Sequence, residues 1–162
     1  MRNNITSKLL DYTVILGITL TILALIGMPL ILTAFFKSNF SLSNQSLIWI
    51  VTACIYLCAI PFVIALFKVK KICGFIKNDN PFSRDIIKSV QVICICSFSE
   101  IITFSLSLIY LKYSVDFFKH ALIIAPILII SFLCVTIGLL CLVVAGLFEK
   151  FIDIKEENDS TI

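Results

Sequence analysis

The chain alternates between four long apolar runs and short polar segments. Each run has the roughly 20 residues, or more, that an α-helix needs to cross the hydrocarbon core of a membrane. None of them shows the apolar–polar alternation of a membrane-spanning strand. The pattern predicts an all-α, polytopic membrane protein with one domain over residues 1–162, a four-transmembrane-helix bundle. Its helices are expected at 12–36, 47–67, 89–111 and 121–148, with a loop at 68–88 and a tail at 149–162.

The composition agrees with this interpretation. Of the 162 residues, 60% are hydrophobic and 14% are charged, and the mean hydropathy is +1.10. Soluble domains are about half apolar and about a quarter charged, and they avoid large exposed apolar patches. This high hydrophobic content and low charge exclude a disordered chain, a disulfide-rich secreted module and a basic nucleic-acid-binding domain. Direct nucleic-acid binding is therefore not expected.

Basic residues are distributed unevenly between the two sides of the predicted bundle. Ten of the thirteen lysine and arginine residues fall in the N-terminal segment, the loop at 68–88 and the tail. The other three, Lys37, Lys112 and Lys119, fall in the two remaining connections. Cytoplasmic segments of membrane proteins are enriched in Lys and Arg. Both termini and the central loop are therefore expected in the cytoplasm.

The sequence offers no arrangement typical of catalysis or metal binding. It has no HExxH-type zinc motif, no glycine-rich phosphate loop and one histidine, His120, at the outer edge of the fourth helix. Six of the seven cysteines lie in predicted helices and the seventh, Cys73, lies in the central loop. Small apolar packing residues are the favoured interpretation, because no pair in an outer loop suggests a disulfide. We expect no enzyme, cofactor or metal.

Three prolines lie inside predicted helices, at Pro29, Pro61 and Pro126. Each removes one intrahelical hydrogen bond and is expected to bend its helix locally. Hinges of a transporter and static kinks are both compatible with the sequence, and static kinks are the commoner case.

The third helix carries Glu100 almost at its centre. An ionised carboxylate at that depth costs about 2.5–3.5 kcal/mol on the more lenient insertion scale, so Glu100 is expected to face the bundle interior. Thr103 and Ser107 fall on the same face and complete an intramembrane polar site. The functional interpretation is a proton or cation site, or a sensor of a small ligand. The structural interpretation, which is favoured, is a polar stripe that fixes helix packing.

The central loop contains the run NDNPFSRD. The second helix is expected to continue as a basic amphipathic turn or two until Asn80 and Pro81 end it. Ser83, or Asn80 with Pro81 at the first helical position, can cap the next helix. The basic loop is either a positive-inside anchor, the favoured interpretation, or a docking surface. The tail turns acidic after Lys150, and its apolar residues predict that the helix continues beyond the bilayer.

These segments resemble one bacterial family of small membrane proteins, the domain of unknown function 2975. Its members typically have four helices, an Asn-Pro-Phe turn after the second helix and an acidic tail ending near Glu-Asn-Asp-Leu-Thr-Ile. Here Asn80, Pro81 and Phe82 match the turn. Ser160 stands where the tail usually has leucine. The matching tail residues are Glu157, Asn158, Asp159, Thr161 and Ile162.

The resemblance implies a multi-pass protein of the bacterial cytoplasmic membrane. Members of the family are often paired with a small helix-turn-helix regulator of the Cro/CI type. The expected function is therefore that of a regulatory scaffold that binds or sequesters such a regulator. The alternatives are an immunity or stress-protection protein, and a small transporter or channel subunit. The lipid bilayer and this regulator are the expected partners. The candidate docking residues are Asn80, Pro81, Phe82, Glu157, Asn158 and Asp159.

Overall fold

Four long helices make up the computed structural model, which describes residues 2–40, 45–77, 83–115, 118–120 and 122–159. Each helix contains a stretch long and apolar enough to span a membrane, and the described residues form no strand. The prediction of an all-helical protein with four membrane-length helices is confirmed. In chain order the helices are α1 (Arg2–Phe40), α2 (Gln45–Lys77), α3 (Arg84–Ser114) and α4 (Ile124–Asp159).

The helices are longer than the apolar runs from which they were predicted. α2 continues to Lys77 and α3 begins at Arg84, so most of the segment expected as a loop at 68–88 is helical. The continuation of α2 and the persistence of α4 to Asp159 agree with the amphipathic patterns of those segments. α4 begins at Ile124, three residues after the expected start. Lysine and glutamate are good helix formers, so a helix does not have to end where its apolar run ends.

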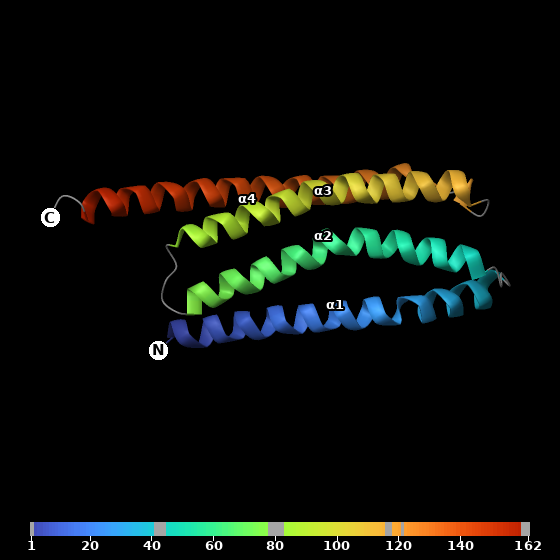
Figure 1. Cartoon of the computed structure of the whole chain (residues 1–162), viewed down its shortest axis with the longest axis horizontal. Helices are drawn as coiled ribbons and strands as arrows, with labels where there is room; N and C mark the ends of the chain where they lie inside the picture. Colours follow the sequence, from blue (N-terminus) through green and yellow to red (C-terminus); the bar gives the residue numbers. More distant parts are fainter. Residues whose placement is uncertain (1, 41–44, 78–82, 116–117, 121, 160–162) are drawn as a thin grey trace.

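The helices form an open antiparallel array in which each packs against its neighbours in the sequence (Figure 1). The backbone of α1 lies close to that of α2, α2 to α3, and α3 to α4; across the described ranges, the backbone of α1 does not come this close to α3 or α4, nor that of α2 to α4. α1 and α4 therefore do not close a ring. One end of the array contains the first residues of α1 and α3 and the last residues of α2 and α4. We call it the basic end.

Buried apolar residues gather in two clusters, one near each end of the array. The cluster at the basic end joins α3 and α4 through Ile86, Val90, Ala145 and Ile152. The cluster at the opposite end joins α1, α2 and α3 through Phe36, Leu47, Val51 and Leu111, with other residues. On α3, the described positions between Cys96 and Ser107 contain no fully buried side chain. The middle of α3, between Cys96 and Ser107, is thus less buried than the two ends of that helix.

Two of the three prolines lie in helix interiors. Pro29 is inside α1 and Pro61 is inside α2. Figure 1 shows α2 changing direction near its middle, the part that contains Pro61. The kink expected at Pro126 was wrong: α4 begins at Ile124, so Pro126 lies in its first turn. The amides of a first turn have no intrahelical partner, so a proline there removes no hydrogen bond.

Candidate functional site

An apolar groove runs along the middle of α3, between α2 and α4. Its wider part has a volume of about 530 Å³. A second part of about 230 Å³ adjoins it on the side of the basic end. Phe62, Glu100, Cys134 and Ile137 line both parts. The groove exists because the backbones of α2 and α4 both lie close to α3 but not to each other, which leaves space between them over a face of α3.

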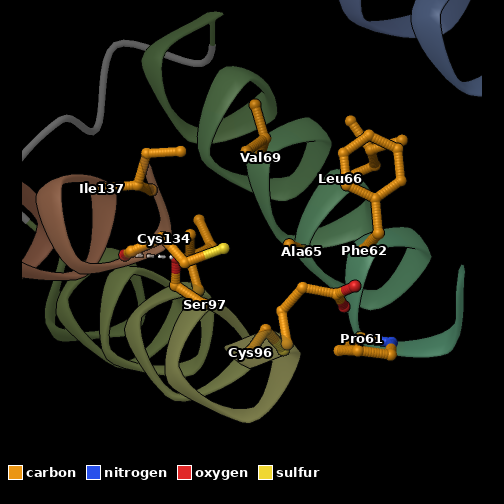
Figure 2. Close-up of a pocket in the computed structure, with 11 residues that line it drawn as sticks. Pro61, Phe62, Ala65, Leu66, Val69, Cys96, Ser97, Cys134 and Ile137 are labelled. Carbon is orange, nitrogen blue, oxygen red and sulfur yellow. Dashed lines mark hydrogen bonds between the residues drawn. The ribbon is translucent and has the colours of Figure 1, made fainter. Parts of the chain in front are cut away.

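The narrower part of the groove is lined by residues of α2, α3 and α4 (Figure 2). α2 contributes one wall, and its first residue there, Pro61, lies beside the side chains of α3. α4 contributes the opposite wall. The labelled lining residues in this view are Pro61, Phe62, Ala65, Leu66 and Val69 of α2, Cys96 and Ser97 of α3, and Cys134 and Ile137 of α4.

Among the described residues that line the groove, Glu100 is the one that carries a charge. Its Oε2 atom is buried and has no hydrogen-bond partner. Burying a polar atom without a partner costs free energy, and the cost is larger for a charged group. This oxygen of the carboxyl group therefore lies in the groove without a hydrogen-bond donor from the described residues.

The other two residues of the predicted polar site have different surroundings. Ser107 is buried, lines the wider part of the groove and lies 3.6 Å from Cys58 Sγ, whose thiol donates to its Oγ. Thr103 donates its hydroxyl to two carbonyl oxygens of its own helix, Ser99 O and Glu100 O, each at 3.2 Å. The structure thus brings Glu100 and Ser107 together in the groove, whereas the Thr103 hydroxyl bonds to the α3 backbone.

Two side chains that the sequence analysis did not single out connect neighbouring helices. Ser97 Oγ on α3 donates to the carbonyl oxygen of Cys134 on α4 at 3.0 Å. Tyr56 Oη on α2 donates to the carbonyl oxygen of Leu25 on α1 at 2.9 Å. Hydrogen bonds of this kind are one of the forces that hold membrane helices together. In the sequence, each of these two residues is recognisable only as a hydroxyl group inside an apolar run. Several other Ser and Thr residues have the same setting, so the sequence does not indicate which hydroxyl groups bond to a neighbouring helix.

All seven cysteines are free thiols, and three of them, Cys73, Cys94 and Cys96, are buried. Cys58 and Cys134 line the wider part of the groove, and Cys96 lines the narrower part. Throughout the described ranges, no group of three or more His, Cys, Asp or Glu side chains is placed to hold a metal ion. These positions agree with the interpretation of the cysteines as small packing residues.

A polar cleft lies at the basic end, between the first turns of α3 and the last turns of α4. Its volume is about 190 Å³, and it brings Arg84 and Lys88 of α3 together with Glu149 and Asp153 of α4. Ser83 precedes α3 as its N-cap: its Oγ accepts a hydrogen bond from the Asp85 amide at 3.2 Å. The prediction that Ser83 can cap this helix is confirmed.

Most of the predicted docking residues lie outside what the structure describes. Asn80, Pro81 and Phe82 fall between the described ranges, and the side chains of Asn158 and Asp159 are also outside them. Glu157 is described, and its side chain is exposed on the last turns of α4.

Comparisons with known proteins agree with a membrane protein of this kind. The chain is 29% identical over 150 residues to the uncharacterized membrane protein YoaS of Bacillus subtilis (strain 168), an alignment covering 86% of this chain and 92% of that protein. No solved structure matches the chain. The family described as "Protein of unknown function (DUF2975)" matches residues 41–162, which include α2, α3 and α4. Since this match covers most of the chain, the protein belongs to the DUF2975 family of proteins of unknown function.

Proposed function

We propose that the protein is a regulatory scaffold of the bacterial cytoplasmic membrane that binds a small cytoplasmic helix-turn-helix transcription regulator at its basic end. The proposal rests on the family resemblance and on the charge distribution at that end. It requires the basic end to face the cytoplasm, as the excess of Lys and Arg there predicts.

The observation that carries the proposal is an acidic stripe on the last turns of α4. Glu149, Asp153 and Glu157 are four residues apart, so they lie on one face of the helix, and all three side chains are exposed. Phe151 and Ile154 on the same segment are 59% and 63% exposed. The end of α4 therefore exposes both acidic and apolar groups. Because Glu149 and Asp153 share the polar cleft with Arg84 and Lys88 of α3, a basic partner would compete with those two residues for the stripe.

This surface fits the chemistry of a DNA-binding regulator. Such a protein carries Lys and Arg side chains that neutralise DNA phosphates. An acidic stripe attracts the same basic surface, so binding to the membrane protein and binding to DNA exclude each other. Exposed ion pairs each contribute less than about 1 kcal/mol, so stable binding also needs apolar contacts such as those of Phe151 and Ile154.

The test is co-purification of the detergent-solubilised protein, with and without residues 156–162, with a small helix-turn-helix regulator of the Cro/CI type. The full-length protein is expected to retain the regulator at low salt, where electrostatic attraction is strongest, and to release it as salt rises. The variant Glu149→Gln/Asp153→Asn is expected to retain less, because it removes two charges of the stripe without changing side-chain size.

The matched control is Asp85→Asn. It removes an exposed carboxylate at the same end of the molecule but on α3, outside the stripe. It is expected to retain the regulator like the unmodified protein. If the full-length protein retains no regulator at low salt, sequestration is wrong, and the immunity or stress-protection alternative becomes the better proposal.

A further inference from the structure

We propose that the groove between α2 and α4 is a binding site for an amphiphilic organic cation. The apolar body of the ligand lies between the two helices, and its positive charge lies against the Glu100 carboxylate. This site is separate from the acidic stripe at the basic end, and the proposal does not depend on regulator binding.

The charge of the groove specifies the charge of the ligand. Within the part of the chain that the structure describes, Glu100 is the one charged side chain lining the groove, and its buried Oε2 has no hydrogen-bond partner. Lipid chains or an apolar helix from a second copy would cover the walls but would leave the carboxylate without a counter-charge. A cation supplies that charge, and a close opposite charge is the interaction that favours an ionised carboxylate away from water.

The size and lining of the groove specify an organic ligand rather than a bare metal ion. The wider part, at about 530 Å³, is within the range of about 300–1,000 Å³ that small-molecule pockets occupy. No cluster of three or more metal-binding side chains exists among the described residues, so a metal ion would have too few protein ligands. The walls are almost entirely apolar side chains, which suit a ligand with an apolar body.

Aromatic residues add a further preference for delocalised or alkylated cations. Phe62 of α2 and Phe104 of α3 both line the wider part of the groove. Aromatic rings attract organic cations through the negative potential of their faces, and the attraction is stronger where water is excluded. Quaternary ammonium and phosphonium ions with apolar substituents are thus the class of ligand that best fits the site.

The experiment measures binding of radiolabelled tetraphenylphosphonium to the full-length protein in detergent micelles by equilibrium dialysis, with protein-free micelles subtracted. Saturable binding is expected to the unmodified protein. Glu100→Gln is expected to weaken it by about tenfold or more, because the charge pair is lost while the size of the side chain is kept. Asp85→Asn, which removes a carboxylate from the same helix outside the groove, is expected to bind like the unmodified protein.

Two further measurements keep the test decisive if Glu100→Gln does not fold. Tetraphenylborate has the same shape and the opposite charge, so it is expected not to bind to the unmodified protein. Leu133→Trp adds bulk to the α4 wall at a half-exposed position and leaves Glu100 intact, and it is expected to abolish phosphonium binding. Absence of saturable phosphonium binding, equal binding of tetraphenylborate, or unchanged binding to a folded Glu100→Gln protein would each overturn the proposal.

Discussion

The ring of Phe98 on α3 lies directly against Gly138 on α4. A Cβ atom at position 138 would be 2.9 Å from Cζ of that ring and 3.1 Å from Cε2. Such distances are shorter than ordinary van der Waals contact, so the absence of a side chain at Gly138 is what allows the ring to lie there. Small residues have this role in many contacts between membrane helices.

Replacing Gly138 by Val is therefore expected to destabilise the contact between α3 and α4. Overpacking of this kind costs about 1–3 kcal/mol, measured as a lower unfolding free energy of the detergent-solubilised protein. Gly146→Val on the same helix is the control, because a Cβ there meets no atom within 4 Å. Removing the ring with Phe98→Ala is expected to relieve most of the Gly138→Val penalty. Equal effects of the two glycine variants would show that the ring contact is unimportant.

Ser97→Ala is expected to weaken the same helix pair by a different mechanism. The substitution removes the hydrogen bond from Ser97 Oγ to the Cys134 carbonyl oxygen. Interhelical hydrogen bonds in membranes contribute about 0.6 kcal/mol on average, and up to about 1.7 kcal/mol. Ser99→Ala is the control, because the Ser99 hydroxyl donates to Cys96 O within α3. Thermal unfolding should show a larger loss of stability for Ser97→Ala than for Ser99→Ala. The opposite order would contradict the role of Ser97 in joining α3 to α4.

The N-cap at Ser83 predicts a local effect at the start of α3. Ser83→Ala removes the oxygen that accepts from the Asp85 amide, and loss of such a cap costs about 1 kcal/mol. Ser83→Asp keeps an acceptor at this position and is expected to retain stability. Unfolding measured by circular dichroism tests both variants. An Asp variant as unstable as the Ala variant would mean that Ser83 acts through something other than capping.

The orientation in the membrane follows from the position of the basic residues. Both ends of the chain are expected in the cytoplasm, because ten of thirteen lysine and arginine residues belong to that side. A green fluorescent protein fusion after Lys155 should fluoresce, whereas an alkaline phosphatase fusion after Asn39 should be active. Fluorescence from a green fluorescent protein fusion after Asn39 would show that the protein has the opposite orientation in the membrane.

The number and character of the helices could be predicted from the sequence, because both are local properties. Run length and hydropathy were enough to predict four membrane-length helices, and Ser83, the N-cap of α3, was one of the two caps predicted there. Glu100 stood out for the same reason: a carboxyl group at the centre of an apolar run is unusual in any arrangement of the helices. The start of α1 was predicted less well, at residue 12 instead of Arg2, because a helix can continue through charged residues such as Lys8 beyond the end of its apolar run.

The arrangement of the helices was decided only by the tertiary structure. Lipid is as apolar as leucine, so hydropathy does not distinguish a residue that faces lipid from one that faces another helix. The contact of Phe98 with Gly138 and the bond from Ser97 to Cys134 depend on how α3 and α4 are rotated about their axes. The groove exists because the backbones of α2 and α4 lie close to α3 but not to each other, and no single apolar run contains that information.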